Sequence, residues 1–228
     1  MKNIRQLCNV YRLGQLEYGK AWNLQKALVK QISEGKRQSA LLLLEHNHVY
    51  TIGRTGSMAD INTSEESLLN LGLSIYETDR GGQVTYHGPG QLIAYPIINI
   101  RALGGPHKYI RALEAIIIKT LSDHNISGLT KDGQTGVWVA DEKIAAIGVK
   151  ISRGISFHGV SLNINPNLGY FKHIIPCGLA GKHITSMEST LAKPMNVDAV
   201  SYSLQYYLGK ELDLILIDSD PAELPDLD

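Results

Sequence analysis

Residues 80–96 read RGGQVTYHGPGQLIAYP and concentrate four glycines, two prolines, a histidine and an arginine in one short stretch. Glycines let the backbone adopt positive φ and approach a ligand closely. Arg80, Gln83, Thr85 and His87 bring hydrogen-bond donors and acceptors to the same place. This composition predicts a loop that forms one wall of a binding site, and we call residues 80–87 the wall.

Hydrophobic periodicity on both sides of the wall predicts alternating strands and helices. The predicted helices are residues 16–32, 63–71, 107–123 and 197–210, and the predicted strands are 39–44, 49–52, 74–78, 92–100, 136–140, 143–151 and 155–164. Strands and helices are interspersed with hairpin-like joins, which favours an α/β (α+β) fold, a mixed β-sheet flanked by helices. We expect one domain over residues 1–217, although a small second lobe from about Lys182 is an alternative.

Charge is distributed unevenly along the 228 residues. The segment 218–228 holds five acidic residues and no basic one, which predicts a flexible acidic tail. The rest of the chain has 17 acidic against 22 basic residues, a surplus that suits an acidic partner. No clustered basic stripe points to nucleic acid, no apolar run reaches the ~20 residues of a membrane span, and the N-terminus lacks a signal peptide. We therefore expect a cytoplasmic protein.

Two cysteines lie far apart and form no Cys-x-x-Cys unit, which argues against a disulfide framework or a zinc site. Cys177 stands between Pro176 and Gly178, a setting that favours a presented thiol, although a lone cysteine is more often structural. Cys8 has no such setting, and we interpret it as structural. Phosphate-binding loops, serine-hydrolase elbows and zinc-protease motifs are absent from the sequence.

Lys143 begins an otherwise apolar strand. An exposed lysine at a strand end is the plain interpretation. Beside Cys177, however, its ammonium group would favour the thiolate and create a nucleophile at neutral pH.

Histidines give weaker signals. His87 has the strongest setting, although it could simply fix a turn by hydrogen bonding. His46 and His48 share a strand face but lack a third nearby ligand, so we expect no metal site. His158 belongs either to a sheet edge or to the same pocket as the wall.

Four motifs in order resemble the lipoyl(octanoyl) transferases. They are RGGQVTYHGPGQ from residue 80 followed by Tyr95 and Pro96, KIAAIG from residue 143, GISFHG from residue 154 and PCG from residue 176. The segment HNHVYTIGR at 46–54 is similar to an early signature of that family. The resemblance implies the catalytic-domain fold of biotin and lipoate protein ligases.

The resemblance also implies an activity. Such an enzyme moves an octanoyl group from acyl carrier protein to a lysine of the lipoyl domains of 2-oxoacid dehydrogenases and of the glycine cleavage H protein. The donor is an activated thioester, so no cofactor, ATP or metal is expected. We expect a monomer that binds neither nucleic acid nor membrane.

By this resemblance, Cys177 is the nucleophile that forms an acyl thioester, and Lys143 activates it and relays protons in a coupled titration. We add the hypothesis that His87 and backbone amides lie near the carbonyl oxygen. Ser161 stands where alanine is expected most often. The implied substrate-binding residues are Arg80, Gly81, Gly82, Gln83, Val84, Thr85, Tyr86, His87, Ala146, Ile147, Gly148, Gly159, Val160 and Ser161.

Three alternatives remain open at this stage. An ATP-dependent lipoate ligase of the same fold would need no cysteine nucleophile. An amidotransferase would move lipoyl groups between proteins through a cysteine thioester. A non-catalytic binding module would keep the pocket and lose the nucleophile, and the presence of Cys177 and Lys143 counts against it.

Overall fold

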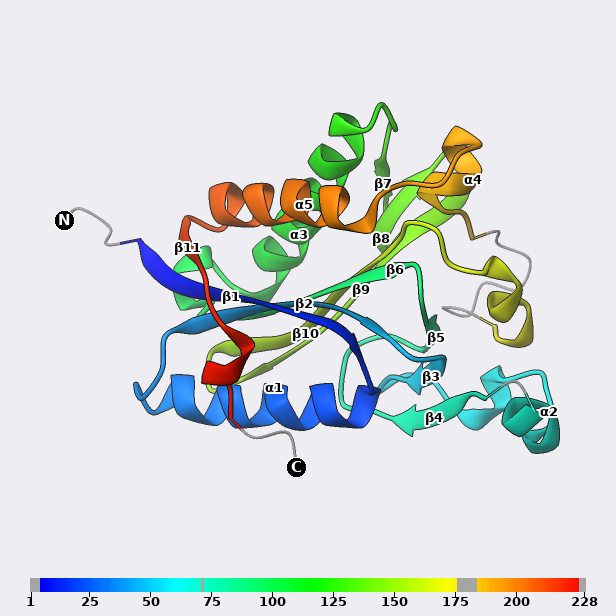
Figure 1. Cartoon of the computed structure of the whole chain (residues 1–228), viewed down its shortest axis with the longest axis horizontal. Coiled ribbons are helices and arrows are strands. Elements are labelled where there is room, and N and C mark those ends of the chain that lie inside the picture. Colours follow the sequence, from blue (N-terminus) through cyan, green and yellow to red (C-terminus); the bar gives the residue numbers. More distant parts are fainter. Residues whose placement is uncertain (1–4, 71, 176–183, 226–228) are drawn as a thin grey trace.

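The computed structural model describes residues 5–70, 72–175 and 184–225, and the predicted nucleophile Cys177 lies outside these residues. At its centre is an eight-stranded sheet with the order β11-β1-β2-β6-β10-β9-β8-β7 (Figure 1). β1 pairs in parallel with β2 and β11, whereas the other neighbours are antiparallel, so the predicted mixed sheet is confirmed. The strands are β1 (Gln6–Leu16), β2 (Ser39–His46), β6 (Gln91–Ile97), β7 (Leu129–Lys131), β8 (Gln134–Val139), β9 (Glu142–Ser152), β10 (Ile155–Asn163) and β11 (Leu214–Asp218).

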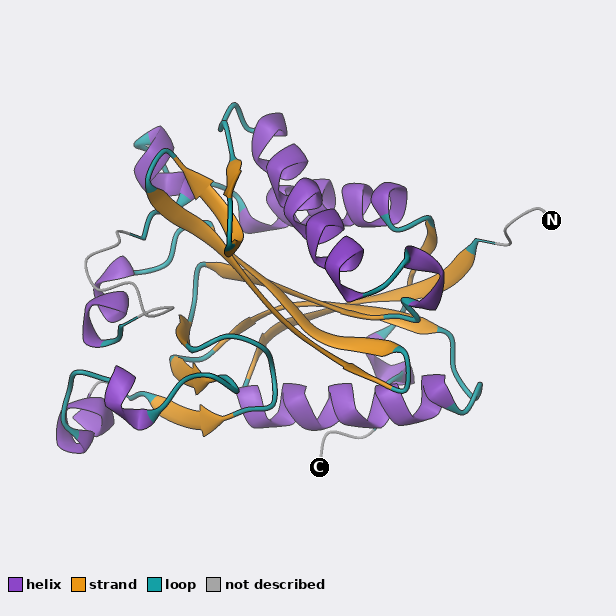
Figure 2. Cartoon of the chain, turned by 180° about the vertical axis from the view of Figure 1, so that it is seen from behind, coloured by secondary structure: helices purple, strands orange, loops and turns teal. Residues whose placement is uncertain are grey.

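Helices cover both faces of this sheet. The helix α1 (Tyr18–Ser33) lies on one face, and α3 (Pro106–Asp123) and α5 (Val197–Glu211) lie on the other (Figures 1 and 2). Two shorter helices are α2 (Glu65–Asn70) and α4 (Met187–Leu191). The positions of α1, α2, α3 and α5 confirm the helices predicted from the sequence, whereas α4 was not predicted. Among the described residues, no helix combines the length and apolar character that a membrane span requires.

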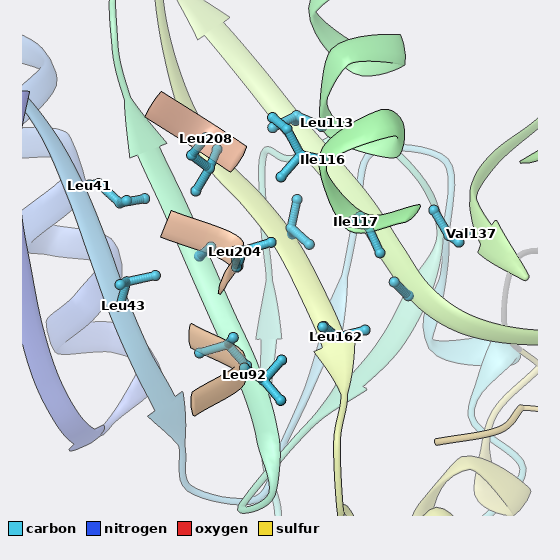
Figure 3. Close-up of a cluster of buried hydrophobic side chains, with 14 of the residues drawn as sticks. Leu41, Leu43, Leu92, Leu113, Ile116, Ile117, Val137, Leu162, Leu204 and Leu208 are labelled. Carbon is cyan, nitrogen blue, oxygen red and sulfur yellow. The ribbon is translucent and has the colours of Figure 1, made fainter. Parts of the chain in front are cut away.

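The main core fills the space between the sheet and the pair α3 and α5. Figure 3 shows leucines of β2, β6 and β10 meeting side chains of both helices, among them Leu41, Leu43, Leu92, Leu162, Leu113, Ile116, Leu204 and Leu208. Burying each such side chain contributes roughly 1.5–3 kcal/mol. Residues of α5 and β11 share this cluster with α3, so these elements pack on the main core, and one domain over residues 1–217 stays a prediction.

A second, three-stranded sheet has the order β4-β3-β5 and carries the wall. Its strands are β3 (Val49–Ile52), β4 (Ser74–Glu77) and β5 (Val84–His87). The expectation of a loop is therefore wrong for residues 84–87, which form β5, whereas β6 begins at Gln91, one residue before the strand predicted from residue 92. Val84 and Tyr86 are buried in another apolar cluster, together with Tyr50 and Ile52 of β3, and Thr85 and His87 alternate with them along β5, so the period of a strand is present within the glycine-rich stretch.

β1 has no counterpart among the predicted strands. Its apolar alternation is interrupted by polar residues such as Arg12, which conceals the pattern of a buried strand. The guanidinium of Arg12 donates hydrogen bonds to Ser201 and Gln205 of α5, so this polar side chain finds partners about 190 residues away. A single sequence carries no local signal for such a pairing.

The segment expected as an acidic tail begins at Asp218, the last residue of β11. The Ser219 N–H donates to the carbonyl of Val10 at 2.9 Å, and the Arg37 guanidinium donates to the carbonyl of Glu223 at 2.6 Å. The described residues 218–225 thus contact the body of the protein. The division of the chain at residue 218 stays a prediction.

His46 is a buried structural residue at the end of β2. Its Nδ1–H donates to the carbonyl of Leu16 at 2.8 Å, and its Nε2 accepts from the Tyr95 hydroxyl at 2.8 Å. Burial lowers the pKa of His46 to about 4, against smaller opposing effects of the Leu16 carbonyl and Glu17. The neutral imidazole is therefore part of the folded state.

This burial predicts an acid-sensitive fold. The folded pKa of His46 lies below the unfolded value of about 6.5, so its contribution to stability is present above about pH 6.5 and is lost as the pH falls toward 4. When the pH falls from about 7 to about 5, the free energy of unfolding of the wild type should decrease by about 2 kcal/mol more than that of the H46Q variant. Denaturant titration at each pH measures both values. The H107Q variant, which removes an exposed histidine, is the control. An unchanged pH slope in H46Q would contradict the assignment.

Candidate active site

A cavity of about 440 Å³ lies between the wall and the strands β9 and β10. Every residue that the sequence implied for substrate binding lines it, except Tyr86, and Lys143 lines it as well. The lining residues from that set are Arg80, Gly81, Gly82, Gln83, Val84, Thr85, His87, Ala146, Ile147, Gly148, Gly159, Val160, Ser161 and Lys143. Segments far apart in sequence therefore converge on one site.

Small residues keep the sheet side of the cavity open. β9 and β10 pair so that Gly148 lies opposite Gly159 and Ala146 opposite Ser161. A Cβ atom at Gly148 would lie 3.0 Å from the carbonyl oxygen of Gly81, so a side chain there would push the wall outward. The lining is predominantly apolar in character, as a hydrocarbon chain requires.

The buried guanidinium of Arg80 holds the wall in place. Nη2 donates to the carbonyls of Thr51 at 2.6 Å and Gln83 at 2.7 Å, Nε donates to the Thr51 hydroxyl at 3.1 Å, and Nη1 donates to the carbonyl of Gly81 at 3.0 Å. The Gly81 N–H in turn donates to the carbonyl of Val149 on β9 at 3.1 Å. Arg80 therefore ties the wall to β3, and a backbone hydrogen bond ties it to the main sheet.

His87 is buried and neutral. Burial is the main cause that holds the pKa of His87 well below its usual range, and nearby His46 adds to the effect. The Gln91 amide donates to Asn163 Oδ1 at 2.9 Å, so its oxygen, 2.7 Å from Nδ1, accepts the imidazole proton. The Nε2 atom is then an acceptor, 3.4 Å from the Thr51 hydroxyl. In this arrangement His87 has no N–H group left to donate to an oxyanion. The structure therefore does not supply the hydrogen-bond donor that we had hypothesised at His87.

Lys143 stands at the opposite end of the cavity from His158. Its Nζ lies 5.1 Å from the centre of the Trp138 ring. A small adjoining hollow is also lined by Lys143, together with Phe171 and Ile184. The Thr185 N–H donates to the carbonyl of Lys143 at 3.0 Å, so the start of the described segment 184–225 lies beside this lysine.

The residues on both sides of 176–183 are anchored. Before this segment, the Ile175 N–H donates to the carbonyl of Asp60 at 2.8 Å and Ile174 pairs with Ile61. After it, Ile184 pairs with Lys143. The predicted pairing of Cys177 with Lys143 itself involves a residue outside the described part of the chain.

Tyr86 belongs to the wall, but its side chain packs in an apolar cluster and does not line the cavity. Its ring stacks on Tyr170 with centres 5.0 Å apart and an angle of 4°, and its hydroxyl donates to Nδ1 of His48 at 2.8 Å. Burial lowers the pKa of His48. His46 and His48 are thus engaged with tyrosines, and the described residues contain no group of three potential metal ligands. Cys8 is fully buried, and burial raises the pKa of its thiol to about 12, in agreement with a structural role.

Sequence reasoning missed the aromatic end of the cavity. Tyr18 of α1 and Tyr95 of β6 line it together with His158, and the Tyr18 ring is parallel to that of His87, with centres 6.2 Å apart. Only tertiary packing brings Tyr18 here, so no local signal marks it. His158, for which the sequence left two positions open, belongs to this pocket.

An ion cluster supports that end. Asp79 accepts from His158 Nε2 at 2.8 Å and from Lys150 Nζ at 2.7 Å. The hydrogen bond from His158, followed by that from Lys150, holds the pKa of Asp79 far below its usual range, despite partial burial. Burial lowers the pKa of His158, and Asp79 partly opposes that effect. The cluster fixes β10 to the segment that enters the wall.

Comparison with solved structures confirms the predicted fold. The crystal structure of a lipoate-protein ligase A bound with ATP matches with a TM-score of 0.78 over 95% of this chain and 89% of that chain. The two sequences are 11% identical, so this likeness concerns the fold alone.

Sequence comparison identifies the family. Residues 17–209 match the lipoyl protein ligase A/B catalytic domain. An octanoyltransferase of Alkaliphilus metalliredigens (strain QYMF) is 39% identical over 213 residues, 92% of this chain and 98% of that protein. An octanoyltransferase of Koribacter versatilis (strain Ellin345) is 43% identical over 200 residues, 85% of this chain and 80% of that protein. The chain therefore belongs to the family of lipoyl protein ligase A/B catalytic domains, among its octanoyltransferases, which are acyltransferase enzymes.

Proposed function

We propose that this octanoyltransferase moves an octanoyl group from acyl carrier protein to a lysine of a lipoyl domain through a thioester on Cys177. The observation that carries the proposal is the apolar cavity that runs from Lys143 to the aromatic end at Tyr18 and His158. Ile184, the first described residue after the segment 176–183, pairs with the cavity-lining Lys143.

The cavity is long enough for an eight-carbon chain. β9 rises at most about 3.3 Å per residue, so the step from Lys143 to Gly148 spans no more than about 17 Å along the strand. An extended octanoyl chain, with carbon–carbon bonds of about 1.5 Å, measures on the order of 10 Å. The carbonyl end would lie toward Lys143, and the methyl end would lie toward the aromatic residues.

The chemistry follows in two balanced steps. The Cys177 thiolate attacks the thioester carbonyl of the donor, the carbon–sulfur bond to the carrier breaks, and the released thiolate takes up a proton. The target lysine amine then attacks the acyl-enzyme, an amide forms, and the Cys177 thiol is released. The donor supplies the activation, so ATP has no role in this scheme.

Lys143 would assist both steps. As an ammonium it favours the Cys177 thiolate, and as a neutral amine it can accept the proton of the incoming lysine. Support comes from the place of Lys143 in the cavity lining and from its backbone pairing with Ile184.

The partners follow from the same chemistry. Octanoyl acyl carrier protein would be the donor, and lipoyl domains of 2-oxoacid dehydrogenases and the glycine cleavage H protein would be the acceptors. The basic surplus of residues 1–217 suits an acidic donor protein. A monomer in the cytoplasm stays our expectation for the assembly and location.

The thioester predicts a detectable intermediate. Incubation of the wild type with octanoyl acyl carrier protein, without an acceptor, should give an adduct of octanoyl mass by intact mass spectrometry. The C177S variant should give no thioester adduct, because the nucleophile is lost. The C8S variant is the matched control and should be acylated as the wild type. Full transfer by C177S in the presence of ATP and free lipoate would instead favour a ligase.

The role of Lys143 predicts a slow enzyme with a changed pH response. We expect K143A to reduce kcat/KM for octanoyl transfer by about a hundredfold or more, the range of general acid–base assistance. Acyl-enzyme formation should shift to higher pH, because no cation remains to favour the thiolate. The control is K119A, which removes a lysine of α3 that forms an ion pair with Glu211 of α5. Wild-type rates and an unchanged pH profile in K143A would remove Lys143 from the mechanism.

A further inference from the structure

Lys143 faces the cavity because β9 is irregular next to it. In a regular strand, side chains three positions apart point to opposite faces. Lys143 and Ala146 nevertheless line the same cavity, and the two residues between them, Ile144 and Ala145, are both buried in the main core. The alternation is therefore interrupted between Lys143 and Ala146.

The pairing with β8 locates the interruption. Val137 pairs with Ala145, and the next residue, Trp138, pairs with Lys143, so one step on β8 corresponds to two on β9. Ile144 is the extra residue of a β-bulge, a feature that redirects side chains near active sites. Because of the bulge, the side chain of Lys143 lies on the same face of the sheet as that of its partner Trp138.

Gly136 leaves the space that the Lys143 side chain occupies. Its φ is 136°, a conformation that residues with a side chain rarely adopt. A Cβ atom there would lie 2.6 Å from Cε of Lys143 and 2.7 Å from the carbonyl oxygen of Ala145. Any larger residue at 136 would displace either the lysine or the bulge.

Glu114 holds the backbone of Gly136 from the other side of the sheet. This α3 residue is 1% exposed, and its Oε1 accepts from the Gly136 N–H at 3.1 Å while Oε2 accepts from Arg111 at 2.6 Å. A carboxylate in an apolar core is costly unless it is paired. No step of the proposed reaction uses Glu114. Its partner Gly136 belongs to β8, the strand in which Trp138 pairs with Lys143.

We infer that Gly136 and Glu114 are positioning residues for Lys143. Glu114 fixes the backbone at Gly136, the missing side chain of Gly136 admits the lysine, and the bulge at Ile144 turns the lysine into the cavity. This inference rests on the role of Lys143 in the proposed function.

A double-mutant cycle tests the inference through activity. We expect G136A to lower kcat about as much as K143A, with KM for octanoyl acyl carrier protein changed by less than about twofold, and to shift the pH profile as K143A does. G136A should cause no further loss in a K143A background. An equal loss in both backgrounds, or a fully active G136A, would overturn the inference.

Conservative variants separate positioning from folding. E114Q keeps an oxygen that accepts from the Gly136 N–H and should retain most activity, whereas E114A should resemble G136A. G105A is the matched control, because Gly105 also has a positive φ of 99° but has open space around its Cβ position. Equal losses in E114Q and E114A, or a loss in G105A as large as in G136A, would count against positioning.

Crystal structures of the wild type and G136A give a readout independent of activity. The Lys143 Nζ should leave its place near the Trp138 ring in G136A, and an unmoved Nζ would refute the inference. If K143A keeps full activity, Lys143 has no role in the proposed reaction, while this comparison still decides the positioning claim.

Discussion

The site depends on one buried cation, the guanidinium of Arg80. Two of the eight wall residues, Gly81 and Gly82, are glycines and add no side chain to a core, so ordering this part of the chain carries an entropic cost. Hydrogen bonds from a charged donor to carbonyls of Thr51 and Gln83 are stronger than neutral ones and fix two distant backbone segments together. Arg80 therefore fixes the backbone that forms one side of the cavity.

The opposite side of the cavity is held by the main sheet, whose strands serve two purposes. One face of β9 and β10 packs on α3 and α5, and the other offers small residues such as Ala146 and Gly148 to the cavity. A close-packed core resists deformation, and the backbone hydrogen bond from Gly81 to Val149 joins the wall to this sheet beside the cavity. A rigid slot of this kind suits an extended hydrocarbon chain.

Much of this arrangement was predictable from the sequence, and the remainder depends on long-range contacts. Glycine and polar content marked the wall, and periodicity marked the helices and the strands that flank it. β1 was missed because Arg12 interrupts its pattern and finds partners only in α5, and Tyr18 was missed because packing alone brings it to the cavity. The orientation of Lys143 depends on a bulge that pairing creates, and no local signal in β9 reports it.

The crystal structure of the octanoyl-loaded enzyme would test the central claim most directly. We expect the acyl chain to lie between Gly81–Gln83 of the wall and Ala146–Gly148 of β9, with its carbonyl toward Lys143 and its methyl toward Tyr18. An acyl chain bound outside this cavity, for example in the shallow groove between α5 and β11, would contradict it.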